Sequence, residues 1–342
     1  MIGSVALLLA STGLLLALPL VPAFRELYLR RDTKPMPIKN RTEMVPDFAF
    51  DFRSQVQDGL AMVGNASATA GARVLESDWF IDKGVSIPDR IYAKGRLAAA
   101  GNNLFAAIFC EQDVDLGENS EVQSWVHAQG VVNVPSGSRV HGRLSAGALV
   151  KLGIGCSFER VLAPMVTVAG GANPKDGQCL EATVRHPAFV PQLRPFLVGE
   201  RSSKWNPEPI HIVERITERV RVKGDFLLQP GEVIRKNVVA GRHVHLSEGS
   251  HVVGNVKSNH DMELEPRVFV EGSLFSAANL RIGAGCVVMG PVVAQGELLI
   301  ESGARIGSRK YPTTVQAKRI QIAPAVTLHG SMWACERGQV TA

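Results

Sequence analysis

Histidines are the residues of this chain with the clearest capacity for chemistry, and the sequence contains nine of them. A histidine can act as a general base, and three at suitable spacing can hold a zinc ion. His141 and His329 each stand immediately before a glycine, at the same point of an internal repeat described below. That point faces outward, and neither residue has a carboxylate neighbour in sequence that would set its tautomer. The pattern therefore indicates exposed strand histidines and no catalytic base.

Three further histidines, His243, His245 and His251, lie close together in the sequence. They fall on neighbouring coils of the repeat, a spacing that suits a single metal ion poorly. The chain has no phosphate-binding P-loop, no GxSxG motif and no HExxH motif, and the glycines of Ile282–Gly285 fit a turn of the repeat. The sequence therefore predicts a protein that is not an enzyme, with no catalytic residue, no metal site and no cofactor.

The charged residues and the cysteines exclude two further classes of protein. The net charge of +5 has no stripe of Lys and Arg interleaved with aromatic residues, which argues against a nucleic-acid partner. The cysteines have no CxxC pair and lie far apart, which predicts reduced, buried thiols and no disulfide framework. They are Cys110, Cys156, Cys179, Cys286 and Cys335.

An internal repeat of about 18 residues is the strongest feature of the sequence. Each coil has apolar residues at positions i, i+6 and i+10, frequent glycines at i+3 and i+8, and a serine or alanine at i+12. One coil consists of Leu246, Gly249, Val252, Gly254, Val256 and Ser258. The next two coils begin at Leu264 and Ile282, and a four-residue insertion precedes the coil that begins at Ile322.

This spacing predicts an all-β fold, a parallel β-helix in two segments. Inward positions share one parity within each short run, as a strand requires, and turns interrupt the runs about every six residues. No coil buries its apolar residues alone, so stability must come from stacking. We expect the first β-helical segment at 98–169, a Pro/Gly-rich insertion or hinge at 170–209, the second segment at 210–336 and a tail at 337–342.

The N-terminal region predicts one transmembrane helix over residues 1–24, because about twenty uncharged residues suffice to cross a bilayer. Basic residues follow this stretch and none precedes it, so the positive-inside rule predicts a cytoplasmic body. A cleaved signal peptide is the competing interpretation, since Val21–Ala23 resembles a cleavage site. The anchor would consist of Leu7, Leu8, Leu9, Leu14, Leu15, Leu16 and Leu18.

Residues 25–97 are expected to form a basic juxtamembrane linker and an N-terminal cap region. Within them, Phe48, Phe50 and Phe52 alternate like a strand. The apolar run Trp79–Ile81 could cap the first coil of the β-helix.

The last coil predicts a site of self-association. Too few residues follow it to form a capping helix, so its unpaired N–H and C=O groups would be exposed beside an apolar cross-section. The alternative is that the tail folds back as a partial plug. The residues expected to contact a second copy are Ile322, Leu328, Met332 and Trp333.

The coils at Leu264–Ala277, Ile282–Ala294 and Ile300–Gly307 resemble those of bactofilins, bacterial polymer-forming cytoskeletal proteins. The resemblance implies a right-handed β-helix that assembles end to end into filaments without nucleotide, and a role in positioning cell-envelope machinery. Two features depart from the usual pattern of that family: the division into two segments and the full N-terminal hydrophobic stretch.

We therefore expect a membrane-anchored, bactofilin-like scaffold that self-assembles through its β-helix ends. Its expected partners are further copies of itself, the inner membrane and envelope-synthesis or cell-wall enzymes. Its expected location is the bacterial inner membrane, as a single-pass protein with its body in the cytoplasm. The alternative is a β-helix acyltransferase or carbohydrate-binding protein that acts on envelope polysaccharide.

Overall fold

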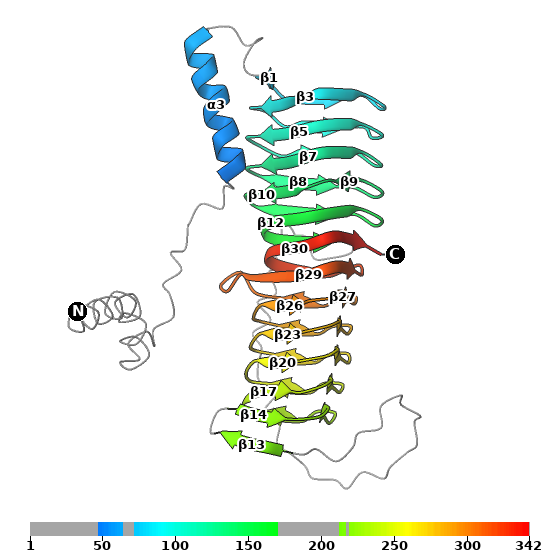
Figure 1. The fold of residues 1–342 in the computed structure, drawn as a ribbon. Coiled ribbons are helices and arrows are strands. Elements are labelled where there is room, and N and C mark those ends of the chain that lie inside the picture. The colour runs from blue at the N-terminus through cyan, green and yellow to red at the C-terminus, as the bar shows by residue number, and fades with distance from the viewer. Residues whose placement is uncertain (1–46, 64–71, 170–211, 217–218, 342) are drawn as a thin grey trace, which may run out of the picture. The chain divides into compact units, whose positions relative to one another are not determined.

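The described residues fold as a β-solenoid of about 12 turns with one short helix (Figure 1). The computed structural model describes residues 47–63, 72–169, 212–216 and 219–341, all within a compact unit that begins at Met44. The predicted parallel β-helix is therefore confirmed.

The coil length is visible in the strand register. Val252, Val270 and Val288, each 18 positions after the last, pair in succession along one face.

Segment 1 of the solenoid comprises residues 72–169. Its turns stack in parallel, so that Ala93 pairs with Cys110, which pairs in turn with Ala128. The strands are β1 (Ala72–Leu75), β2 (Trp79–Ile81), β3 (Ser86–Ala93), β4 (Leu97–Ala99), β5 (Leu104–Cys110), β6 (Val114–Asp115), β7 (Glu121–Ala128), β8 (Val131–Val134), β9 (Arg139–Val140), β10 (Arg143–Ala146), β11 (Leu149–Leu152) and β12 (Ser157–Val168).

Segment 2 comprises residues 219–341 and is preceded by β13 (Ile212–Ile216), which pairs antiparallel with its first strand. The other strands are β14 (Arg219–Val222), β15 (Phe226–Leu228), β16 (Val233–Ile234), β17 (Asn237–Ala240), β18 (Val244–Leu246), β19 (His251–Val252), β20 (Val256–Ser258), β21 (Met262–Leu264), β22 (Phe269–Val270), β23 (Leu274–Ser276), β24 (Leu280–Ile282), β25 (Val287–Val288), β26 (Val292–Ala294), β27 (Glu297–Ile300), β28 (Arg305–Ile306), β29 (Thr313–Ile322) and β30 (Thr327–Val340).

Alternation of side chains along each short strand builds the core. In β23, Leu274 and Ser276 are buried while Phe275 between them points outward, as the two-residue period of a strand requires. The buried serine fits the narrow corner because its Oγ lies within hydrogen-bond distance of the carbonyl oxygens of His260 (2.7 Å) and Asn279 (2.8 Å), and its one O–H can donate to either. The repeat therefore needs a small residue at this position, and a serine there leaves no polar atom unsatisfied.

The predicted strand through the alternating phenylalanines is wrong. Those residues belong to helix α3 (Asp47–Val63), because the apolar side chains that meet the solenoid recur at intervals of three and four residues. Ala49, Phe52 and Val56 are buried against segment 1, whereas Phe50 is 58% exposed.

Several predicted boundaries also differ from the structure. Segment 1 begins at Ala72, earlier than the expected 98, and Trp79–Ile81 is strand β2 within it. The expected tail belongs largely to β30, which continues to Val340. The expected insertion at 170–209 lies outside the described residues.

The predicted fold class needs one correction, because no transmembrane helix is part of the fold that the structure shows. Within the described ranges, no helix is both long enough and apolar enough to cross a membrane. Residues 1–24, including the leucines expected to form the anchor, lie outside those ranges.

Replacing a core residue tests the inward and outward assignment. Val288→Asp should lower the stability of segment 2 by several kcal/mol, because a carboxylate would be buried without a partner. Gln295→Asp, at an exposed position in the same region, is the matched control and should have little effect. Thermal unfolding followed by circular dichroism measures both. Equal melting temperatures for the two variants would contradict the assignment.

Candidate functional site

The two segments meet end to end at their C-terminal turns, where β12 pairs with β30 (Figure 1). This pairing is antiparallel, whereas the strands within each segment stack in parallel. The contact runs around all three faces of the solenoid, with Ser157 opposite Gln339, Val161 opposite Met332 and Thr167 opposite Thr327. We call this contact the junction.

Backbone hydrogen bonds close the junction beyond the paired strands. Val340 accepts from the N–H of Gly155 and donates to the carbonyl oxygen of Cys156, both at 3.0 Å. At another corner, the N–H of Val168 donates to Val326 (3.1 Å), and that of Ala325 donates to Ala169 (2.8 Å). The outer edges of both terminal turns are thereby satisfied within one chain.

Side chains make the junction a continuous core. Met332 lies opposite Val161 and Leu328 opposite Val166, and all four are buried. A Cβ atom on residue 338 would overlap the ring of Phe158, so glycine is required there for the two turns to approach.

On the outside of the junction, the guanidinium of Arg160 lies 4.5 Å from the ring centroid of Trp333, which is 40% exposed. This geometry is a cation–π contact between the two segments.

The predicted uncovered C-terminal coil is therefore wrong. Leu328, Met332 and Trp333 lie on β30 and face segment 1 of the same chain. Ile322 is one turn further from the junction and pairs with Ile300 and Val340. The last turn does have the expected backbone edge, but segment 1 pairs with it. The 18-residue repeat could not predict this pairing, because it contains no information about an antiparallel contact between segments.

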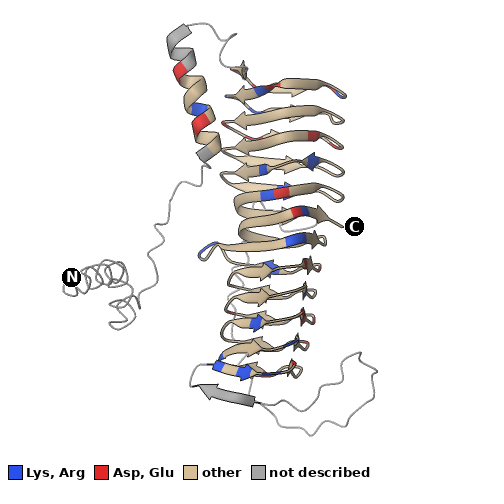
Figure 2. Cartoon of the chain, in the orientation of Figure 1, with Lys and Arg blue, Asp and Glu red and all other residues tan. Residues whose placement is uncertain are grey.

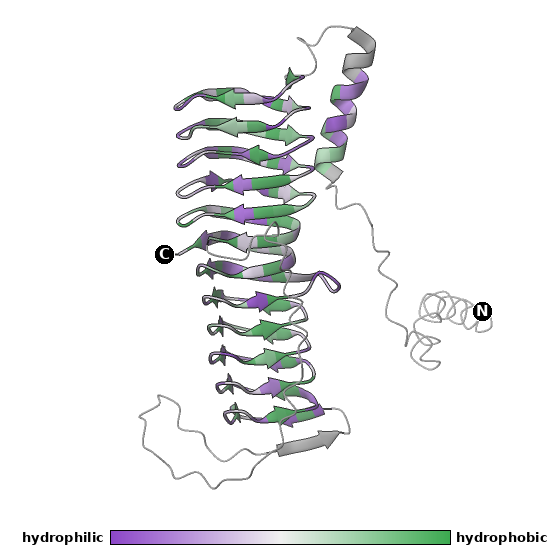
Figure 3. Cartoon of the chain, turned by 180° about the vertical axis from the view of Figure 1, so that it is seen from behind, coloured by the Kyte–Doolittle hydropathy of each residue, from purple (hydrophilic) through white to green (hydrophobic). Residues whose placement is uncertain are grey.

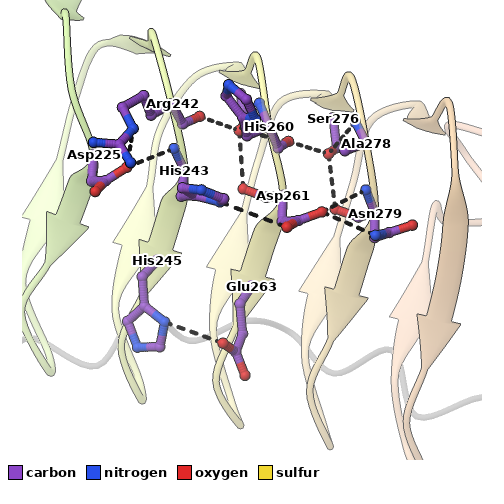
Figure 4. Close-up of polar contacts among 11 residues, drawn as sticks. Asp225, Arg242, His243, His245, His260, Asp261, Glu263, Ser276, Ala278 and Asn279 are labelled. Atoms are coloured by element: carbon purple, nitrogen blue, oxygen red, sulfur yellow. Dashed lines mark hydrogen bonds and ion pairs between the residues drawn. The ribbon is translucent and has the colours of Figure 1, made fainter. Parts of the chain in front are cut away.

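The histidines of segment 2 stand beside carboxylates in columns along the solenoid (Figure 4). His245 Nδ1 lies 3.6 Å from Glu263 Oε2, and its Nε2 lies 3.1 Å from Glu265 Oε1. His251 Nε2 lies 2.9 Å from Glu271 Oε1. In the sequence these histidines were considered only as metal ligands, and the carboxylates beside them were missed. The missed signal was their separation of 18 to 20 residues, which places them on the adjacent turn.

A second column follows one corner of segment 2 and pairs side chains with backbone groups of the next turn (Figure 4). Asp225 accepts from the N–H of His243 (3.0 Å), and Asp261 accepts from that of Asn279 (3.0 Å). Asn279 in turn accepts from the N–H of Glu297 (2.9 Å). These contacts stabilise the turns, which is a structural role.

The two histidines singled out for catalysis occupy different environments. His141 Nε2 lies 2.9 Å from Glu121 Oε1, so it does have a carboxylate partner, one turn earlier. His329 is half-buried beside the junction, where burial and the nearby charge of Arg309 lower its pKa. The two side chains stand on different segments, and no contact joins them in the described part of the chain.

Helix α3 covers a column of outward-facing aromatic residues on segment 1. Phe52 packs against Tyr92, Phe109 and Trp125, and the rings of Tyr92 and Phe109 stack with centroids 5.2 Å apart. The Tyr92 hydroxyl donates to Glu111 Oε1 (2.6 Å), and burial raises the pKa of Tyr92 to about 12. The helix is therefore an integral part of this face.

His127 continues the same column and is almost completely buried. Its Nδ1 lies 2.8 Å from Ser145 Oγ, and burial lowers the pKa of His127 to about 4. A serine beside a histidine can form a nucleophile–base pair, but both side chains are about 1% exposed and no substrate could reach them.

The cysteines agree in part with the prediction of buried thiols. Cys110, Cys156 and Cys286 are buried, and burial raises their pKa values to about 11, 12 and 11 respectively, so they are poor nucleophiles. Cys335 is exposed, and Cys179 lies outside the described residues.

No cluster of three or more histidine, cysteine, aspartate or glutamate side chains suited to a metal ion occurs in the described residues. Comparison of the chain with protein families, with curated proteins and with solved structures finds no match. The resemblance to bactofilins therefore stays a prediction, and the junction is the feature of the structure that bears most directly on function.

Gly338→Ala tests the close approach at the junction. The added methyl group would overlap Phe158, and such overpacking should cost roughly 1–3 kcal/mol in the free energy of unfolding. Gly224→Ala is the matched control, because a Cβ there meets nothing within 4 Å. Chemical denaturation measures both. Equal stability of the two variants would show that the junction does not need the glycine.

The buried histidine predicts a pH dependence of stability. Unfolded His127 takes up a proton near its ordinary pKa of about 6.5, whereas the folded residue does so only near 4. Between these values the unfolded state binds more protons, so stability falls as the pH falls, by at most about 1.4 kcal/mol per pH unit.

His127→Phe should remove this contribution and flatten the profile between pH 6.5 and 4, since the Ser145 hydroxyl keeps its contact with the Val126 carbonyl oxygen. His260→Gln, at an exposed position, is the control. Free energies of unfolding across this pH range measure the effect, and parallel profiles for wild type and His127→Phe would contradict it.

Proposed function

We propose that this protein is a non-enzymatic scaffold, a rigid rod that associates with further copies of itself through an open solenoid end. The junction carries the proposal, because it demonstrates that terminal turns of this sequence can pair edge to edge with continuous core packing. An antiparallel contact between two such ends follows an approximate two-fold relation, the arrangement found in symmetric dimers.

The end available for such a contact is the N-terminal turn of segment 1. Strands β1 and β2 pair with β3 and β4, and among the described residues no strand pairs with their outer edges. Leu75, Trp79 and Val85 pack on the core there but are only partly buried. An unpaired edge beside apolar side chains is a template for another chain.

The opposite end of the rod is open only in part, because β13 covers the edge of β14, whereas no described strand pairs with the outer edges of β15 and β16. A contact that uses one end of each copy joins rods in pairs, whereas a filament built from end-to-end contacts alone needs two open ends. We therefore propose that the end-to-end contact joins rods in pairs and that β13 blocks the other end. The expected role in positioning envelope-synthesis machinery rests on the resemblance to bactofilins and is part of this proposal.

Leu75→Lys tests the open end. A lysine at this half-buried position would set two like charges against each other across a two-fold contact, which should weaken association at least about tenfold. Small-angle scattering and electron microscopy of the full chain should show rods joined end to end for wild type and no end-to-end joints for the variant.

Ile154→Lys is the matched control, since Ile154 is an exposed apolar residue far from the N-terminal turn. It should leave the length distribution unchanged. Single wild-type rods at tens of micromolar would overturn the end-to-end proposal.

A further inference from the structure

The repeat of segment 2 is broken by one insertion, and the inserted residues form a projecting hairpin. Val288 pairs with Ile306, 18 positions later, but Ile306 pairs with Leu328, 22 positions later. The extra residues leave the stack between β28 and β29 and project beyond it (Figure 1). Insertions in repeat proteins often supply the loops of a binding face.

Two backbone hydrogen bonds close the hairpin, and its tip is cationic. The N–H of Ser308 donates to the carbonyl oxygen of Tyr311, and the reverse bond is also formed, both at 3.0 Å. Arg309 and Lys310 occupy the tip, where both are exposed and neither forms an ion pair with another described residue. Tyr311 is 58% exposed, and the Lys310 ammonium lies 5.3 Å from the centroid of its ring. We call Ser308–Tyr311 the basic hairpin.

Helix α3 presents the complementary chemistry. The face away from segment 1 carries Asp51 and Asp58, which are exposed and lie two helical turns apart, so they share one stripe. Phe50, beside Asp51, is 58% exposed. The described residues provide no ion-pair partner for either aspartate. The exposed stripe of α3 is therefore acidic with one aromatic residue, while the basic hairpin is cationic with one aromatic residue (Figure 2).

Both features project from the same side of the solenoid, as front and rear views agree (Figures 1 and 3). We propose that the basic hairpin of one copy binds the acidic stripe of α3 on a second copy, with the two rods side by side. Arg309 and Lys310 would pair with Asp51 and Asp58, and Tyr311 would contact Phe50.

The contact can be made twice in one pair of copies. On each rod, α3 covers turns of segment 1 and the hairpin leaves a turn of segment 2 beyond the junction (Figure 1). Two antiparallel rods related by a two-fold axis between these features would place each hairpin on the helix of the other copy. Such an isologous contact closes at two copies.

A second copy is a better occupant than an anionic lipid surface. A flat anionic surface that met the hairpin would also approach Asp51 and Asp58 on the same side of the rod, and like charges would repel it. A second copy satisfies both features at once. This side-by-side contact does not depend on the end-to-end contact proposed above.

The test is a charge exchange between two variants of the full chain. Arg309→Glu with Lys310→Glu should prevent side-by-side association because the hairpin would meet an acidic helix. Asp51→Lys with Asp58→Lys should prevent it because the hairpin would meet a basic helix. We expect each pair of substitutions to raise the dissociation constant at least about tenfold. An equimolar mixture should restore association, since both contacts are then complementary.

The cross-section from small-angle scattering separates the two proposals, because side-by-side contact thickens the rod whereas end-to-end contact lengthens it at constant cross-section. Arg235→Glu with Lys236→Glu, another consecutive basic pair of segment 2, is the matched control and should leave the cross-section unchanged.

Thin wild-type rods, or a mixture that fails to restore thick ones, would overturn the proposal. Binding to phosphatidylglycerol vesicles that is lost in Arg309→Glu with Lys310→Glu, without rescue by mixing, would also overturn it and identify a lipid surface as the occupant.

Discussion

Each turn of a parallel solenoid has two backbone edges whose N–H and C=O groups need hydrogen-bond partners, and this need explains most of the structure. Interior turns satisfy it by stacking, as the uninterrupted series Val252, Val270, Val288 illustrates. A terminal turn has a neighbouring turn on one side only, so its other edge stays free. A free edge beside an apolar cross-section is prone to pair with another chain. This chain satisfies two of those edges by turning its segments toward each other at the junction, and it covers part of a third with β13.

The 18-residue period of the sequence was sufficient to predict the stacking of turns and the buried positions within each segment. Buried thiols were expected, and Cys156 and Cys286 are both buried, because each turn repeats the same inward and outward parity. The period could not predict the junction, since Val161 opposite Met332 is a contact between the last turns of two separate periodic stretches. A period relates residue i to residue i+18 and contains nothing about antiparallel partners. Helix α3 was missed for a related reason: Phe48, Phe50 and Phe52 fit a period of two, whereas the buried residues Ala49, Phe52 and Val56 follow the helical one.

The same stacking governs the polar residues. Side chains 18 to 20 positions apart become neighbours, so a histidine that seems isolated in the sequence, such as His141 or His245, stands beside a carboxylate. Exposed pairs of this kind contribute little to stability individually. The side chain to backbone contacts at the corner of segment 2 instead set the register between successive turns. Asp225, Asp261 and Asn279 each accept a hydrogen bond from a backbone N–H of the following turn. The columns of polar side chains therefore have a structural role, which is to fix the register of the stacked turns.

The junction also limits which surfaces of this protein are available for contacts between copies. In a solenoid with two free ends, each copy can add to the next without limit. Here the antiparallel contact between β12 and β30 places an approximate two-fold relation inside the chain, so the C-terminal turn that a separate copy could have used is occupied. The contacts proposed above therefore use the N-terminal turn of segment 1 and the flanks of the rod. Both proposed contacts are two-fold, so each contact joins two copies and leaves no equivalent surface free for a third. An assembly that uses both contacts can still extend, because one contact lies at the end of the rod and the other along its side. Copies joined alternately by the two contacts would form a staggered array.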